Sequence, residues 1–508
     1  MKGTDDLFLL IKSLTRTEKR YFKLATKGSS NENEFNYLIL FDIIDKQKDY
    51  DENKVIVAFF KNREIKNFPN DKKHLYSLIL KSLNKYHSTI SKENELNELL
   101  NSAQILNKKQ LPEQCNKLLN KLTLFAEKHE LYTGLIKIGE LRSEIIVQKA
   151  NSSNVMREEF DSIRHYSNLA IEKLTTENKF NNLFTQLLEK IRKDGETLRH
   201  PSEKKWFIDF STNPLLENEN QASTLKSKSI FYFINGTINY IIGNLEKAIH
   251  YYQKDIEHLE KESENTLIDP SLYSAKISNI CLIFLKKKDY ISLALYREKL
   301  KNTTTNFPME KSKLFYRYYD LLLKQYVLTG DFIKAIEIYK SIEEEMKEHV
   351  NNIHKSRIIS FNYSIAYSYL AISNFKEAKI WVNKLLDEKT NYRNDLLCFT
   401  RVLDCIIQLE TGNENSLESS LRATSYFIKK SDKIYQFEIL FLKFFTKILK
   451  EINSTKRIEL MMAFKNELNL LKENPYESEF LDYFDMISWL ESKITGVSFI
   501  EIIKNKNR

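Results

Sequence analysis

One sequence unit recurs through the second half of the chain, and it restricts the fold more than any other feature. Its clearest copy places large apolar residues at helical spacing on both sides of a Gly-Asp-aromatic turn: Tyr319, Leu322, Leu323, Tyr326, Gly330, Asp331, Phe332, Ala335 and Tyr339. Gly330 suits the position after a helix end, where φ is positive. Asp331 suits the cap of the next helix, and Ala335 is small enough for two helices to cross closely. The unit therefore predicts two helices joined by a tight turn.

The same frame returns five more times, with different fidelity. Good copies run over residues 232–252 and 362–382, and weaker copies over 277–300, 405–417 and, early in the chain, 99–119. The small-residue position recurs at residues 248, 293, 335, 378 and 417, at intervals of 45, 42, 43 and 39 residues. An array with this spacing predicts stacked helix pairs, whose core grows with each added pair.

This pattern resembles the tetratricopeptide repeat, in which an aromatic and a Leu-small pair on the first helix precede a Gly-Asp-aromatic turn. The resemblance implies a right-handed α-α solenoid whose first helices line a concave surface for a partner. The standard unit has about 34 residues. Because the units here are longer, we expect each helix to be about one turn longer or each loop to be extended.

Composition supports an all-α fold class. The 508 residues include only 10 glycines and 7 prolines, too few for the many turns of a large sheet protein. The cysteines Cys115, Cys281, Cys398 and Cys405 form no CxxC pair. The apolar run Leu7–Ile11 is too short for a secretion signal, and no stretch approaches the roughly 20 apolar residues of a membrane span. We therefore expect a cytoplasmic protein with no membrane span.

Residues 1–90 lie outside the repeat frame and predict a small basic helical head. A capping box, Thr15-x-x-Glu18, opens one helix, and others are expected over 35–44, 52–60 and 71–85. The head holds 17 Lys and Arg against 12 Asp and Glu, a balance of +5 out of the +9 of the whole chain. Its opening, Ser13–Lys23, resembles an uncharacterised bacterial family that also carries helical repeats, with no known activity.

The remaining divisions follow from the repeat frame and from turn residues. We expect N-terminal helical repeats over 95–198, a connector over 199–223 that holds Pro201 and Pro214, tetratricopeptide-like repeats over 224–430, and C-terminal helical repeats with a cap over 431–508.

The motifs of catalysis are missing from the sequence. The 9 histidines form no HExxH pair, the glycines form no phosphate loop, and no Gly-x-Ser-x-Gly is present. The run 343–345 of three glutamates sits in a helical stretch, where consecutive side chains point about 100° apart and do not converge on one atom. We therefore expect no enzyme activity, no metal site and no cofactor.

The resemblance carries the groove positions of the solenoid over to nine residues of the first helices. They are mainly aromatic and hydroxylated, with one charged set: Phe233, Thr237, Tyr240, Arg317, Asp320, Lys324, Tyr363, Tyr367 and Leu370. Tyrosines bury large rigid areas and keep a polar tip, which suits recognition of a protein or peptide partner. The alternative is that these tyrosines close the core between long helices.

Two functions follow from these patterns. The first is a protein–protein interaction scaffold that binds a partner segment on its concave face. The second is a regulator whose head contacts nucleic acid through the helix over 71–85, which carries Lys72, Lys73, Lys81 and Lys85. An ordinary Lys-rich amphipathic helix has the same pattern.

Overall fold

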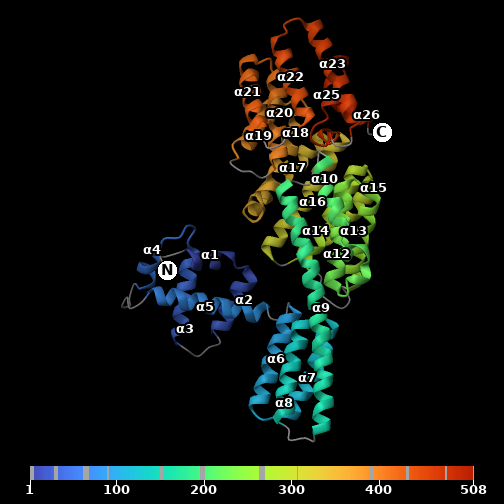
Figure 1. Ribbon diagram of the computed structural model, residues 1–508. Coiled ribbons are helices and arrows are strands. Elements are labelled where there is room, and N and C mark those ends of the chain that lie inside the picture. Colours follow the sequence, from blue (N-terminus) through green and yellow to red (C-terminus); the bar gives the residue numbers. More distant parts are fainter. Residues whose placement is uncertain are drawn as a thin grey trace. The chain divides into compact units, whose positions relative to one another are not determined.

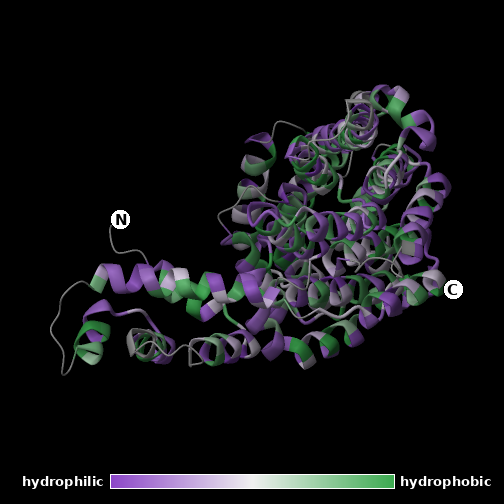
Figure 2. Ribbon diagram, turned by 90° about the horizontal axis from the view of Figure 1, so that it is seen from below, coloured by the Kyte–Doolittle hydropathy of each residue, from purple (hydrophilic) through white to green (hydrophobic). Residues whose placement is uncertain are grey.

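The computed structural model describes residues 5–27, 32–60, 68–87, 91–148, 153–194, 201–262, 269–305, 307–388, 393–430, 434–474 and 477–506. Within these ranges the chain forms 26 α-helices and two short 3-10 turns, and no strand (Figure 1). The predicted all-α fold class is therefore confirmed. Hydrophilic and hydrophobic residues alternate around the helices (Figure 2), as expected for helices that pack on one side.

The chain divides into two compact units, residues 1–174 and 175–508. The division falls inside α9 (Ser153–Asp194), a helix of 42 residues. It does not fall in the predicted connector.

The first unit begins with the five helices of the head. These are α1 (Asp6–Ser13), α2 (Arg16–Lys27), α3 (Glu32–Lys46), α4 (Glu52–Phe59) and α5 (Phe68–His87). They share one apolar core, in which Ile11, Phe41 and Leu75 are fully buried. The helices expected over 35–44, 52–60 and 71–85 correspond to α3, α4 and α5. Helix α1 was not predicted. Its apolar run, Leu7–Ile11, was assessed only as a possible secretion signal.

The Ser13–Lys23 motif has a structural role in the head. Thr15 and Glu18 form the expected capping box, because the Thr15 amide donates to the Glu18 carboxylate at 2.7 Å and the Glu18 amide donates to Thr15 Oγ1 at 3.2 Å. Glu18 also bonds to His87 of α5 at 2.7 Å. Lys19 and Lys23 pair with carboxylates of α3 at 2.6 and 2.5 Å. The motif thus ties α2 to both neighbouring helices.

The rest of the first unit packs α6 (Lys92–Lys108), α7 (Pro112–Lys128) and α8 (Tyr132–Gln148) against one another, followed by the first part of α9. Ala103 and Cys115, two positions of the early repeat copy, are fully buried between α6 and α7. The Cys115 thiol contacts the Ala103 carbonyl at 3.2 Å.

The second unit continues with six consecutive helix pairs. The pairs are α12 (Leu225–Ile242) with α13 (Leu245–Glu262), α14 (Pro270–Lys287) with α15 (Tyr290–Asn302), α16 (Pro308–Thr329) with α17 (Phe332–His349), α18 (Lys355–Ala371) with α19 (Phe375–Leu386), α20 (Asn394–Glu410) with α21 (Glu414–Lys430), and α22 (Gln436–Lys450) with α23 (Ser454–Lys472). First helices also pack on first helices, α14 on α16, α16 on α18 and α18 on α20. This is the packing of a helical-repeat solenoid. The face formed by the first helices α12 to α20 is called the inner face below.

The segment expected as a connector is part of the packed core. It contains α10 (Pro201–Ser211), α11 (Pro214–Glu217) and a 3-10 turn over Glu219–Gln221. Phe207 and Leu216 are buried in the core that α12 shares with α9. The two prolines that indicated a break instead stand at the first residues of α10 and α11, where a missing amide hydrogen costs nothing. Residues 199 and 200 lie outside the described ranges.

The repeat positions have the local geometry that the sequence predicts, with one exception. Gly330 and Gly412 follow helix ends with φ of 77° and 69°. Gly236 lies where α12 and α13 cross, and a Cβ atom there would stand 2.9 Å from the Tyr252 ring. Asp331 occupies the cap position of α17, but its side chain accepts no amide hydrogen of that helix. It instead pairs with Lys504 at 3.3 Å and accepts from Thr329 Oγ1 at 3.2 Å.

Alanine at Gly330 should destabilise the second unit more than alanine at Gly412. Both substitutions force an L-residue into the left-handed region, at a cost of about 1–2 kcal/mol. At Gly330 the new Cβ would also stand 3.0 Å from Ile503 Cγ2, whereas nothing lies within 4 Å at Gly412. The midpoint of urea unfolding, followed by tryptophan fluorescence, measures the difference, because all 3 tryptophans lie in the second unit. Equal losses would contradict the packing at Gly330.

Candidate functional site

The inner face at α18 is covered by the end of the chain itself. Residues 477–506, called the C-terminal segment here, contain α24 (Phe480–Tyr483), α25 (Met486–Thr495) and α26 (Phe499–Lys506) (Figure 1). Tyr363 of α18 donates its hydroxyl to the Tyr483 carbonyl at 3.1 Å. The Tyr367 hydroxyl accepts the Asp485 amide hydrogen at 3.2 Å. Two groove positions thus bind the backbone of this segment.

Aromatic rings complete the contact between the C-terminal segment and the helix pairs. Tyr483 stacks on Phe399 of α20 with ring centres 4.4 Å apart. Phe499 of α26 lies between Phe332 and Tyr367, at 6.2 and 6.4 Å. The Trp489 indole donates to Glu410 at 2.8 Å. Because Phe480, Phe484 and Met486 are fully buried, the segment is an integral part of the core.

The third set of predicted groove residues is therefore interior. Tyr363, Tyr367 and Leu370 are 5%, 6% and 4% exposed. Burial raises the pKa of both tyrosine hydroxyls well above its ordinary value. Their burial agrees with the alternative stated in the sequence analysis, in which these tyrosines close the core between long helices. They close it against a segment more than 100 residues further along the chain, because the sequence separation of the Tyr363–Tyr483 bond is 120.

The predicted groove residues of α12 are also largely covered. Thr237 is buried, and its hydroxyl shares a hydrogen bond of 2.9 Å with Tyr252 of α13. Phe233 is half-buried against Phe184 of α9, with ring centres 5.4 Å apart. Tyr240 is half-buried, and Lys286 lies over its ring at 5.9 Å.

The predicted residues of α16 form a charged region between α14 and α18. Arg317 donates through Nη1 to the Ser271 carbonyl at 3.0 Å and to the Ser274 hydroxyl. Asp320 is buried, pairs with Lys324 at 2.6 Å and accepts from Ser360 at 3.2 Å. Arg317 and Lys324 keep part of their side chains in solvent. This part of the inner face is accessible and carries net positive groups.

Two cations that the sequence did not single out belong to the same region. They are Lys313, one turn before Arg317 on α16, and the exposed Arg357 in the first turn of α18. Burial and then the like charge of Arg357 lower the pKa of Arg317 to about 10. Burial alone would raise the pKa of Asp320, but Lys324 and Arg357 hold it below its ordinary value. Lys313, Arg317, Lys324 and Arg357 are called the Arg317 cluster below.

A buried ion pair between the first two helix pairs was also missed. Lys276 of α14 and Asp255 of α13 are 3% and 0% exposed and bond to each other, and Ser229 of α12 donates to Asp255 at 2.7 Å. Burial raises the pKa of Asp255 even with Lys276 beside it. From a single sequence, charged residues are expected at the surface. This buried pair becomes visible only in the structure, where α12, α13 and α14 bring its side chains together.

The lysines proposed for nucleic acid differ in their surroundings. Lys72 pairs with Glu52 of α4 at 2.8 Å and lies over the Phe68 ring at 5.2 Å, so it holds the head together. Lys73, Lys81 and Lys85 are exposed on α5. At 100° per residue they fall within about 120° of one another around that helix.

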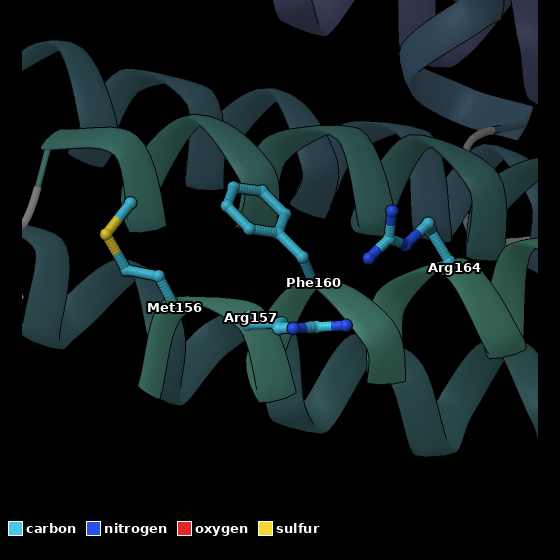
Figure 3. A pocket seen from close by; sticks show the side chains of 4 residues that line it. All are labelled: Met156, Arg157, Phe160 and Arg164. Carbon is cyan, nitrogen blue, oxygen red and sulfur yellow. The ribbon is translucent and has the colours of Figure 1, made fainter. Parts of the chain in front are cut away.

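The described residues were compared with the requirements of a metal or nucleophile site. They contain no cluster of three or more potential metal ligands. Burial raises the pKa of the Cys281 and Cys405 thiols to about 12, which leaves both protonated at neutral pH. A depression of about 390 Å³ on α9 is lined by Met156, Arg157, Phe160 and Arg164, none of which is a nucleophile or a general base at neutral pH (Figure 3). Among the described helices, none combines the length and apolar character of a membrane span.

Tyr367→Ala should lower the free energy of unfolding of the second unit by about 3–5 kcal/mol, as large aromatic truncations do in a core. Tyr426→Ala is the matched control, because Tyr426 lies on α21 with 70% of its surface exposed, and it should change the free energy by less than about 0.5 kcal/mol. Urea unfolding followed by tryptophan fluorescence measures both. A Tyr367→Ala protein as stable as the control would mean that the C-terminal segment does not cover α18 in solution.

Comparison with known proteins does not assign the chain to a family. No protein-family model matches the chain, and no curated protein matches it significantly.

Proposed function

We propose that this protein is a non-catalytic interaction scaffold that binds a segment of a partner protein on its inner face. The observation that carries the proposal is the way this face holds the C-terminal segment. Tyr363 binds a backbone carbonyl and Tyr367 binds a backbone amide, while aromatic rings take up the side chains. The inner face thus accommodates one polypeptide segment at α18, which supports the binding of a partner segment elsewhere along the same face.

The part of the inner face assigned to the partner lies around the Arg317 cluster. The surface at α12 is covered by α9, and that at α18 by the C-terminal segment. Charged side chains of α16 and α18 keep solvent-exposed atoms between these two covered regions. The repeat geometry at Gly236, Gly330 and Ala335 supports a tetratricopeptide-like array as the framework. The four cysteines form no disulfide, which supports a reducing, cytoplasmic location.

Site-specific photo-crosslinking in the native host tests the proposal. A photoreactive residue in place of Lys313 on α16 should capture a partner protein, because this position borders the accessible inner face. The matched control replaces Ile333, which lies on α17 of the same helix pair and is 59% exposed. A specific adduct from position 313 alone is the expected result. Equal capture from both positions, or none from position 313, would count against inner-face binding.

A second candidate function is nucleic-acid contact through the head, favoured by the three exposed lysines of α5. The full chain should then bind duplex DNA with a steep salt dependence. Replacing Lys73, Lys81 and Lys85 together with Gln should reduce the log–log salt slope by about 2.7, since each phosphate contact contributes about 0.9. The control replaces Lys108, Lys117 and Lys121, which are exposed on α6 and α7. Absence of binding at low salt would end this candidate.

A further inference from the structure

The Arg317 cluster has unused hydrogen-bonding capacity on a fixed support. Both hydrogen bonds of Arg317 within the described residues leave through Nη1, toward Ser271 and Ser274 of α14. Its Nε and Nη2 donors therefore remain available on the solvent side. The Arg357 side chain makes no hydrogen bond or ion pair with the described residues, and Lys313 Nζ makes one long contact of 3.4 Å to the Ser271 hydroxyl. Three cations from two adjacent helices thus offer donors to a ligand.

Among the described residues, no carboxylate forms a hydrogen bond or ion pair with the side chain of Arg317 or Arg357, although three carboxylates act on them through space. Asp320 is already paired with Lys324 and buried. Asp269 acts on Arg317 only through space, because its carboxylate caps α14 by accepting the amides of Ser271 and Leu272. Glu310 likewise acts at a distance, and it accepts a hydrogen bond from Thr305 at 3.3 Å. Arg317 and Arg357 stand on the packed helices α16 and α18 and act on each other as like charges, with no carboxylate bonded to either side chain among the described residues.

We infer that the Arg317 cluster is the recognition site for an acidic peptide segment of a partner protein, with a ligand carboxylate held between Arg317 and Arg357. This inference rests on the proposed scaffold function. The planar guanidinium fork matches a carboxylate through two parallel N–H···O bonds, and Arg317 is positioned in advance by α14. An anchored donor group loses little freedom on binding, so more of the contact energy appears as affinity.

An acidic polypeptide fits this surface better than a second copy of the chain. The chain carries a net charge of +9, so two copies repel each other. The inner face a short distance along the array already accepts a polypeptide backbone at Tyr363 and Tyr367. A peptide with carboxylate side chains therefore matches the charge of the region.

The test uses the full chain and a fluorescein-labelled oligoglutamate peptide, with binding followed by fluorescence anisotropy at low salt. Arg357→Glu should weaken binding about tenfold or more, since it replaces a charge-assisted contact by a repulsion. Arg317→Gln should weaken it by a similar factor. The control Arg422→Glu changes the net charge equally on the exposed surface of α21, and it should leave binding within about twofold of the parent protein. Oligoglutamine should not bind.

Three results would overturn the inference. One is an Arg357→Glu protein that binds oligoglutamate like the parent, and another is an Arg422→Glu protein that loses as much affinity, which would indicate general charge attraction. The third is displacement of the peptide by inorganic phosphate at matched charge, which would indicate a phosphate site. Tryptophan fluorescence checks that each variant is folded. If photo-crosslinking at position 313 captures a partner while oligoglutamate fails to bind, the scaffold function stands and only the acidic chemistry is wrong.

Discussion

Two tyrosine hydroxyls of α18 hold the backbone of the C-terminal segment, and the architecture of the second unit depends on that contact. Tyr363 and Tyr367 lie one turn apart, so both point to the same side of their helix. One accepts and the other donates, which satisfies a carbonyl and an amide that would otherwise be buried without partners. Around this pair the rings of Phe332, Phe484 and Phe499 exclude water. The inner face is thereby divided into a closed part at α18 and an accessible part at α16.

This division gives the accessible part a chemistry of its own. Where the chain covers itself, the contact is aromatic and its polar groups are satisfied internally. Where it does not, the inner face carries arginine and lysine, and the buried carboxylate of α16, Asp320, is already paired to Lys324. The partner that we propose would therefore meet cations supported from α14, because Tyr363 and Tyr367 are already covered.

The fold could be predicted from the sequence largely because its local signals agree with one another. Helical spacing, the glycines after helix ends and the small residue at each crossing all indicate the same helix pairs. The Thr15-x-x-Glu18 capping box indicates a head helix in the same local way. What failed depended on long-range packing. The burial of Tyr367 requires Phe484 and Phe499, which no local pattern connects to it. Asp331 was expected to cap its own helix, but its carboxylate forms an ion pair with Lys504 of α26. The groove positions were taken from the standard repeat of about 34 residues. Lys313 and Arg357 precede those positions on the first helices α16 and α18, so they were not predicted.

The return of the C-terminal segment changes how such an array can form. In a solenoid whose units touch only their neighbours, each unit can fold as soon as it is complete, and units can be lost from either end. Here Lys286 pairs with Glu479, which is 193 residues away in the chain, and Gly330 packs on Ile503. Removal of residues 477–506 would therefore leave the aromatic rings of α18 and α20 without the segment that covers them. The stability of the middle pairs thus depends on a segment far along the chain as well as on their neighbouring pairs.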